Sequence, residues 1–376
     1  MFKMNIAIVG MGISGLLTTL HLLSNKHINT VVIFEKRNVS YIPRKHCTGI
    51  ISRETLARIP YADKFIENSY RYVEISTHGG LNLCLVFDKD SIYKIDRVAH
   101  EKMLIDFVES KCVKINYGEH IVGIENLGDR YRILGEKPSN ELFDAVVISE
   151  GYPPRLSKAV GLKAIYKPLK SLQQSVYLNK KLRYEQVKTL YTYLGVNREG
   201  FAWFVPKDDR KAVVGVAVKD SPDLYLRFTK KLFEKRLNVE VDRVEDTYGG
   251  TVLRGYPKKL VIGRILGIGD ALAMVKSLSG GGLYAISITS KIYGENIHNP
   301  QFIQKKITSL IRELKQHFLL YRAGERILPS IEHLSKKRSI IVEVYKSYLY
   351  DNHVKMFIEF IKTPGVLAKI LVQLIH

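Results

Sequence analysis

The feature that most constrains the fold is a glycine-rich turn at residues 10–15, with the sequence GMGISG. An apolar run at residues 6–9, typical of a buried strand, precedes it, and residues 16–23 follow with apolar side chains at helical spacing. A second apolar run, residues 30–34, ends at Glu35. Strand, glycine turn, helix, strand and acid in this order predict a dinucleotide-binding fold.

Each position in this segment has an expected role. Gly10 permits a tight turn, Gly12 lets the backbone approach a pyrophosphate, and Gly15 lets the helix pack on the strand. The helix start offers free N–H groups to phosphates, and Glu35 is placed to accept a hydrogen bond from a ribose hydroxyl. The cofactor-binding residues predicted here are Gly10, Gly12, Ser14, Gly15, Glu35, Lys36 and Arg44.

The chain carries 58 Lys and Arg against 37 Asp and Glu, a formal net charge of +21. This excess is explained either by a lysine-rich solvated surface or by an anionic partner, such as lipid headgroups or an acidic electron carrier. Nucleic acid is not expected, because no recognised binding module is visible. Three cysteines without metal-type spacing predict no metal site, and a reducing cytoplasm is the expected compartment. The sequence has no apolar run long enough to span a membrane, so a membrane-spanning helix is not expected.

The order of patterns predicts an α/β (α+β) protein in three parts. Residues 1–165 and 245–300 form the expected nucleotide-binding domain, with inserted strands at 70–95. Residues 166–244 have long, often aromatic strands and are expected to form an antiparallel sheet that binds the substrate. Residues 301–376 are expected to be helical and basic.

Four further patterns favour FAD over NAD as the nucleotide. Arg97 heads a predicted helix and can meet a pyrophosphate or the flavin edge, and the strand at Val122 offers main chain to an adenine. Ser149-Glu150-Gly151 and Gly269-Asp270 each end a predicted strand. The glycines at 280–282 let backbone approach a flat ring and aim helix N–H groups at it. The additional cofactor-binding residues predicted are Arg97, Val122, Glu150, Gly151, Gly269, Asp270, Gly280, Gly281, Gly282 and Leu283.

This order of motifs resembles the geranylgeranyl reductase branch of the para-hydroxybenzoate-hydroxylase-type flavoproteins, up to about residue 300. The specific marks are Cys47-Thr48-Gly49, the stretch FAWFVP at residues 201–206 with Gly215 after it, and Gly269-Asp270 with the triple glycine. The family signature is Tyr-x-Trp-x-Phe-Pro followed by Gly-x-Gly. Here Phe201, Val205 and Ala217 depart from it, and Glu150 stands where such flavoproteins usually carry Asp.

The resemblance implies a GR2-type Rossmann-like FAD-binding domain and a reductase that saturates isolated double bonds of prenyl chains. It places Cys47 and Gly49 beside the flavin as cofactor-binding residues. It also implies that Cys47 is a proton donor or a packing residue and that Trp203 lies in the catalytic site. The substrate-binding residues expected from it are Phe201, Trp203, Phe204, Val205, Pro206 and Gly215. The expected substrates are prenyl chains of archaeal-type membrane lipid precursors or of a quinone.

Two rival functions remain open from the sequence: a flavin monooxygenase, and a non-catalytic flavin electron carrier or prenyl-lipid binding protein. The external electron donor is a ferredoxin or NAD(P)H, and the sequence does not decide between them. Basic residues after residue 301 and an apolar tail at 354–375 predict either packing on the body or peripheral contact with the inner face of an anionic membrane. His46 is an alternative proton source, whereas Cys84 and Cys112 are expected to be structural.

Overall fold

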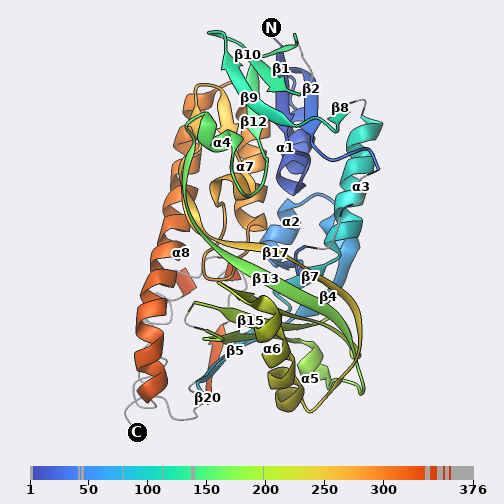
Figure 1. Ribbon diagram of the computed structural model, residues 1–376, viewed down its shortest axis with the longest axis vertical. Helices are drawn as coiled ribbons and strands as arrows, with labels where there is room; N and C mark the ends of the chain where they lie inside the picture. The colour runs from blue at the N-terminus through green and yellow to red at the C-terminus, as the bar shows by residue number, and fades with distance from the viewer. Residues whose placement is uncertain are drawn as a thin grey trace.

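The protein is elongated, with one sheet in the upper part of Figure 1 and a second in the lower part. The computed structural model describes residues 3–40, 43, 46–78, 80–111, 113–136, 140–197, 199–334, 339–344, 350–351 and 355–356. The predictions for Arg44, Cys112 and most of the tail at 354–375 lie outside the described residues. Among the described helices, none is long and apolar enough to cross a membrane.

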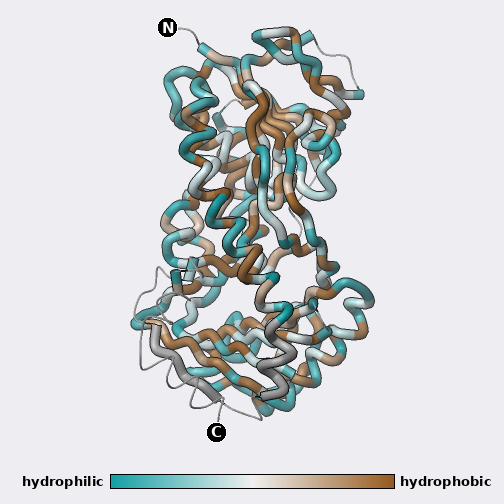
Figure 2. The backbone as a smooth tube through the Cα atoms, turned by 90° about the vertical axis from the view of Figure 1, so that its left-hand side faces the viewer, coloured by the Kyte–Doolittle hydropathy of each residue, from teal (hydrophilic) through white to brown (hydrophobic). Residues whose placement is uncertain are grey.

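The upper part is built on a six-stranded sheet in the order β18-β19-β12-β1-β2-β8. All neighbouring strands are parallel except β18 and β19. These strands are β1 (Met4–Val9), β2 (Ile28–Glu35), β8 (Lys114–Tyr117), β12 (Ala145–Ile148), β18 (Val261–Ile262) and β19 (Ile265–Gly267). Residues of β1 and β12 are almost wholly buried and apolar, as expected for a parallel sheet covered on both faces. Figure 2 shows these hydrophobic strands surrounded by more hydrophilic segments.

Helices cover this sheet and connect it to the rest of the chain. Helix α1 contacts both α7 and α3, which places the glycine-rich turn between buried elements. Asp96 caps α3 by accepting hydrogen bonds from Val98 N and Ala99 N, and the predicted helix after Arg97 is therefore confirmed. The helices are α1 (Ile13–Leu23), α2 (Arg53–Arg58), α3 (Arg97–Ser110), α4 (Leu156–Ala159), α5 (Tyr184–Val187), α6 (Pro222–Leu237), α7 (Leu283–Asn296) and α8 (Pro300–Leu334), with 3-10 turns η1 (Ala62–Phe65) and η2 (Gly269–Leu272).

The lower part is an eight-stranded sheet in the order β17-β13-β16-β15-β14-β5-β6-β20. One face is covered by α6 through a core that includes Tyr191, Phe204 and Phe233. The other face is turned toward the upper part of the molecule (Figure 1). The strands are β5 (Tyr72–Thr77), β6 (Asn82–Phe87), β13 (Lys163–Leu178), β14 (Thr189–Leu194), β15 (Phe201–Pro206), β16 (Lys211–Val218), β17 (Val241–Lys259) and β20 (Ser339–Val344).

Two small sheets complete the fold. One contains β3 (Ile50–Ser52), β7 (Ile92–Ile95) and β4 (Ile66–Tyr70), and the other contains β11 (Leu142–Phe143), β10 (Tyr131–Gly135) and β9 (Ile121–Asn126). The cysteine turn of residues 46–49 comes directly before β3 in the first of these sheets.

The sheet boundaries differ from those expected from the sequence. Strand β17 belongs to the lower sheet, whereas residues 245–300 were expected to return to the nucleotide-binding part. Strands β5 and β6, within the expected insertion 70–95, also belong to the lower sheet, because β5 pairs in parallel with β14. Strand β20 was not expected in the C-terminal region; it pairs with β6. The mixed α/β class with a helical C-terminal region is confirmed.

Strands β13 and β17 connect the two parts. They pair with each other from Lys163–Lys259 to Leu178–Val241, with register shifts at three points. In Figure 1 this two-stranded ribbon runs from beside α4 down to the lower sheet. It therefore forms a continuous wall along both parts of the molecule.

Candidate active site

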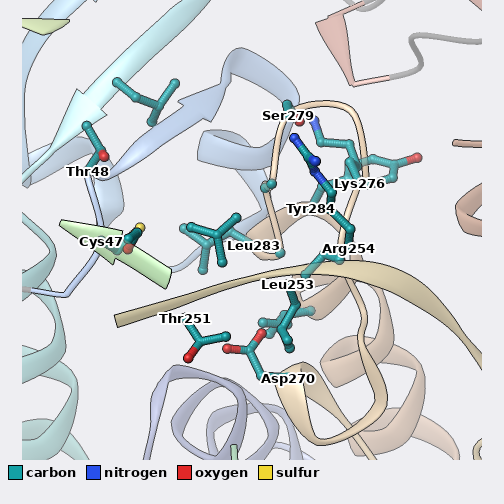
Figure 3. A pocket seen from close by; sticks show the side chains of 18 of the residues that line it. Cys47, Thr48, Thr251, Leu253, Arg254, Asp270, Lys276, Ser279, Leu283 and Tyr284 are labelled. Atoms are coloured by element: carbon teal, nitrogen blue, oxygen red, sulfur yellow. The ribbon is translucent and has the colours of Figure 1, made fainter. Parts of the chain in front are cut away.

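One cavity of about 1680 Å³ extends from the glycine-rich turn to the lower sheet. Ligand pockets for a single drug-sized molecule usually occupy about 300–1,000 Å³. The cavity therefore has room for a cofactor and a second ligand together. Its wall combines four residues of the glycine-rich turn (Gly10, Gly12, Ile13 and Ser14), the cysteine turn, the triple glycine and an apolar sheet face. Figure 3 shows part of it, with Cys47 and Thr48 on one side of Leu283 and with Arg254 and Lys276 on the other.

The glycine-rich turn has the geometry that the sequence predicts. Gly10 has φ +100°, and a Cβ there would lie 2.5 Å from Ser149 O. A Cβ on Gly15 would lie 2.2 Å from Gly10 O, so Gly15 permits the close packing of helix and strand. Gly12 has open space where a Cβ would stand and lines the cavity. Because α1 has no side-chain cap, its first N–H groups are available to a ligand.

Glu35 lies at the turn, but its carboxylate is already fully used. Oε1 accepts from Arg37 N and Nε, and Oε2 accepts from Met11 N and Arg37 Nη2. Burial would raise the pKa of Glu35, yet these hydrogen bonds and the Arg37 charge outweigh it and lower the pKa. A carboxylate has about four lone-pair sites. A ribose hydroxyl therefore gains a place on Glu35 only by displacing one of the donors of Arg37 or Met11, and the sequence did not indicate this competition. Lys36 also lines the cavity.

The cysteine turn is held from two sides. Thr48 Oγ1 lies 2.8 Å from Gln173 Oε1, and Gln173 Nε2 donates to His46 O at 3.4 Å. Gly49 has φ +81°, and a Cβ there would lie 2.3 Å from Ile95 O. Cys47 is exposed to the cavity, and its Sγ accepts from Gly49 N at 3.4 Å. The thiol is therefore presented to the cavity by a constrained loop.

Arg97 and Asp270 lie on the cavity wall near this turn. Arg97 is buried and paired with Glu101, and its Nε has no hydrogen-bond partner in the described structure. Burial raises the pKa of the Asp270 carboxyl, and electrostatic interaction with His46 and Arg97 opposes that rise. An unsatisfied buried donor is costly. Arg97 is therefore suited to bind an acceptor group of a ligand.

The triple glycine forms the start of α7. Lys276 N donates to Gly281 O, and Gly280 has φ +71°, so residues 276–281 form a tight hairpin. Gly280, Gly281, Gly282 and Leu283 line the cavity. Gly282 is the N-cap of α7 without a side-chain cap, which leaves backbone N–H groups for a ligand. Cofactor binding by these residues stays a prediction.

Strand β15 divides its side chains between the two faces of the lower sheet. Phe201, Trp203 and Val205 line the cavity together with apolar residues of β5, β6 and β14. Phe204 instead packs against Tyr191 and Phe233 beneath α6. The prediction that Phe204 contacts the substrate is therefore wrong, because alternate residues of a strand point to opposite faces.

Gly215 and Pro206 also lie outside the cavity wall. Gly215 pairs with Trp203 across the sheet, and a Cβ on Gly215 would lie 2.3 Å from the indole atoms Cε2 and Cζ2. Gly215 therefore makes room for the Trp203 side chain and acts on the cavity through it. Pro206 contributes its carbonyl, which accepts hydrogen bonds from Tyr70 and Asn68.

Three predicted cofactor residues have placements that the sequence did not indicate. Val122 is 61% exposed and lies outside the cavity, whereas the neighbouring Ile121 lines it. Gly269 packs on Ser14, where a Cβ would lie 2.8 Å from the hydroxyl oxygen. Glu150 lines the cavity, but its carboxylate accepts from the backbone N–H groups of residues 155–157 at 2.7–3.1 Å. Glu150 thus holds the start of α4, with Gly151 beside it on the wall.

Several buried polar residues of the cavity carry no motif in the sequence. Lys276 Nζ lies 2.6 Å from Asp351 Oδ1, and Ser52 and Thr55 donate to the other carboxylate oxygen. Gln173 and Arg254 lie on the long ribbon of β13 and β17. Their partners are distant in sequence, so only the fold identifies them. The described residues contain no cluster of three or more metal-ligating side chains.

The fold and the cavity define the class: this is the fold of flavin-dependent enzymes. It is similar to the crystal structure of a geranylgeranyl bacteriochlorophyll reductase-like protein from Thermoplasma acidophilum, with a TM-score of 0.73, 17% identity and 99% of each chain covered. It is also similar to a variant of the halogenase PltM in complex with FAD, with a TM-score of 0.64, 12% identity, and 88% of this chain and 77% of the other covered.

Curated relatives carry a more specific name, digeranylgeranylglycerophospholipid reductase. The protein from Methanocaldococcus jannaschii is 24% identical, over 77% of this chain and 76% of its own length. The Methanococcus vannielii protein is 22% identical over 87% and 89%, and one from Methanopyrus kandleri is 31% identical over 59% and 58%. No family model matches the chain. The resemblance to geranylgeranyl reductases predicted from the motifs is confirmed by these relatives.

Proposed function

We propose that this protein is an FAD-dependent reductase that saturates isolated double bonds in the geranylgeranyl chains of a membrane lipid precursor. The observation that carries this proposal is a continuous cavity that extends from the glycine-rich turn to an apolar sheet face. The names of the curated relatives support the substrate class, and the flavin-dependent structural neighbours support the cofactor class.

The residues present fit FAD. Open space beside Gly12 and the uncapped start of α1 suit a pyrophosphate, and the unpaired Nε of Arg97 offers a donor to a polar group of the cofactor. The backbone at 280–282 suits a flat ring beside α7. When bound and reduced, FAD supplies the two electrons and one of the two hydrogens that the double bond takes up.

The chain itself would orient the prenyl chain, exclude water and supply a proton. An unactivated alkene has no carbonyl that can take up developing charge, so its position relative to the cofactor matters most. Phe201, Trp203 and Val205 form an apolar wall for the prenyl chain. The chain binds there because each CH₂ gains about 0.8 kcal/mol on leaving water. Cys47 holds its thiol proton at Sγ on the cavity surface and is the proposed donor to the second carbon.

The decisive test is product analysis under anaerobic conditions. The FAD-loaded protein is reduced with dithionite and incubated with a geranylgeranyl glycerolipid, and the product is examined by mass spectrometry. We expect a mass increase of two hydrogens per saturated bond. A hydroxylated product that forms only when oxygen is admitted would instead identify a monooxygenase, and unchanged lipid in both cases would leave a flavin carrier or lipid-binding protein.

Peripheral membrane contact and the external electron donor complete the proposal. A chain of twenty carbons does not cross water freely, so the enzyme has to meet its substrate at a bilayer. Basic residues on α8, among them Lys305, Lys306 and Arg312, are suited to an anionic surface at about 1 kcal/mol each. The same positive charge suits an acidic ferredoxin as reductant, with NAD(P)H as the alternative.

Co-sedimentation with liposomes tests the membrane contact. We expect binding to vesicles that contain anionic lipid, weaker binding to neutral vesicles, and release as ionic strength rises, because salt screens exposed charges. Binding that is indifferent to both lipid charge and salt would contradict electrostatic contact. A Lys305→Gln, Lys306→Gln variant should shift the release to lower salt.

A further inference from the structure

Arg254 is a buried cation at the edge of the cavity that the proposed reaction does not use. It is only 5% exposed, and it lines the cavity beside Phe201. Its guanidinium carbon lies 5.1 Å from the centre of the Phe201 ring and 4.1 Å from that of Tyr321. The two aromatic contacts and the strand β17 fix the orientation of the guanidinium group.

The hydrogen bonds of Arg254 use only part of its donor capacity. Nη1 donates to Glu199 O at 2.7 Å and to the Tyr321 hydroxyl at 2.8 Å. An arginine has five N–H donors. Among the described residues, Nε and Nη2 have no hydrogen-bond acceptor, so they remain available to a ligand in the cavity.

The charge of Arg254 is also incompletely neutralised. Its ion-pair partner among the described residues is Glu325, at 4.0 Å, and Glu325 is shared with Lys167 at 2.9 Å and Arg322 at 3.3 Å. Glu199 adds a second carboxylate, which lies 3.1 Å from Lys167. Three cations therefore share two carboxylates. Burial lowers the pKa of Arg254 to about 10, with Glu325 and Glu199 opposing the shift.

A second buried cation enters the cavity from the neighbouring segment. Ser277 Oγ accepts a hydrogen bond from Gly255 N and donates one to Gly255 O, so these two segments lie side by side. Lys276 and Arg254, which precede Ser277 and Gly255 in the sequence, are therefore neighbours in space. Figure 3 shows both side chains on the same side of the cavity, away from Cys47. Lys276 forms a close ion pair with Asp351 at 2.6 Å, whereas Arg254 on the same side of the cavity has only the shared Glu325 at 4.0 Å.

We propose that Arg254 binds a phosphate-type oxyanion at this side of the cavity and so selects prenyl lipids with an anionic headgroup. This inference rests on the proposed function for the identity of the lipid. A guanidinium group suits a phosphate because its planar donors match two oxygens at once. The apolar sheet face next to Phe201 then receives the hydrocarbon chain, with the headgroup held at a fixed distance from Cys47.

The test compares two lipids that differ only in the headgroup: a digeranylgeranylglycerol and its phosphate. Binding to the FAD-loaded protein in micelles is followed by the fluorescence of Trp203, the single tryptophan of the chain, which lines the cavity. We expect Arg254→Gln to weaken binding of the phosphate by about 10- to 100-fold and to leave the neutral lipid unchanged. Arg254→Lys should lose less, because it keeps the charge.

Arg322→Gln is the matched control. It removes one positive charge from the same cluster, but Arg322 is not part of the cavity wall, so both lipids should bind as before. Equal weakening of both lipids by Arg254→Gln, or no weakening of either, would overturn the proposal. Thermal melting of each variant separates loss of binding from loss of folding.

Glycerol phosphate distinguishes a headgroup site from a site for free phosphate. Displacement of the phosphate lipid from the wild-type protein by millimolar glycerol phosphate supports a site for any such oxyanion. Headgroup selectivity that depends on Arg254 without such displacement supports a site for the lipid alone. Product analysis tests the proposed function separately. If the protein binds the phosphate lipid selectively but saturates no double bond, the reductase proposal fails and the anion site stands. If both lipids are saturated and bind with equal affinity in every variant, only the anion site fails.

Discussion

Replacement of Cys47 by alanine should leave FAD bound and remove most of the reductase turnover. The thiol lies on the cavity surface in a turn held by Gln173 and Gly49, and alanine fits that turn without strain. A general acid in position contributes about 10²- to 10⁴-fold, so we expect turnover to fall about 100-fold or more. Flavin absorbance and the rate of formation of saturated lipid measure the two effects separately.

Cys84→Ala is the control for this experiment. Cys84 is half-buried in β6 and does not line the cavity, and burial raises the pKa of its thiol. Its removal should leave turnover unchanged. If Cys47→Ala retained full turnover, the thiol would have no part in protonation, and His46 on the same turn would be the next residue to replace.

Replacement of Gly215 by valine should disorganise the substrate wall while the nucleotide turn stays intact. A Cβ at Gly215 would overlap the Trp203 indole at 2.3 Å, so the ring or the strand has to move. Overpacking of this kind costs about 1–3 kcal/mol of folding free energy. A displacement of about 1 Å at a reacting group can cost about 100-fold, and we expect a loss of that order in kcat/KM for the prenyl lipid.

Two further variants identify the cause of that loss. Gly250 lies in β17 of the same sheet, with open space where its Cβ would stand, so Gly250→Val should leave stability and activity unchanged. Trp203→Ala should lower the folding free energy less in the Gly215→Val background than in the wild type, because there it also removes the overlap with the indole, and activity should stay low in both backgrounds. Strictly additive losses of stability would show that Gly215 acts through some contact other than the indole.

The nucleotide end of the site could be predicted because its signals are local. The turn at residues 10–15, its strand and its helix are adjacent in sequence, and the steric demands on Gly10 and Gly15 follow from that geometry. The structure places Glu35 at the end of β2 beside this turn, but the sequence does not show that Arg37 and Met11 occupy all of its carboxylate. A side chain's hydrogen-bond partners depend on rotamers, and the sequence pattern does not fix them.

The substrate end was harder to predict because its pairings are distant. The first half of β17 is polar, mostly exposed and followed by Gly249 and Gly250, so it lacks the alternation of a half-buried strand. It is an edge strand, and its partner β13 begins almost eighty residues earlier. The substrate role predicted for Phe204 is wrong for a reason that the sequence already contains. Neighbouring residues of a strand point to opposite faces, so Phe204 and Trp203 cannot both face the cavity. Asp351 could not be linked to Lys276 by any local pattern.

The ribbon of β13 and β17 has a mechanical consequence. Two strands paired along their whole length resist bending far more than a single connecting segment would, and they span both the nucleotide end and the lipid end. A hinge motion between the two sheets would have to break backbone hydrogen bonds between β13 and β17. We therefore expect the oxidised, reduced and lipid-loaded forms to superpose as one rigid frame.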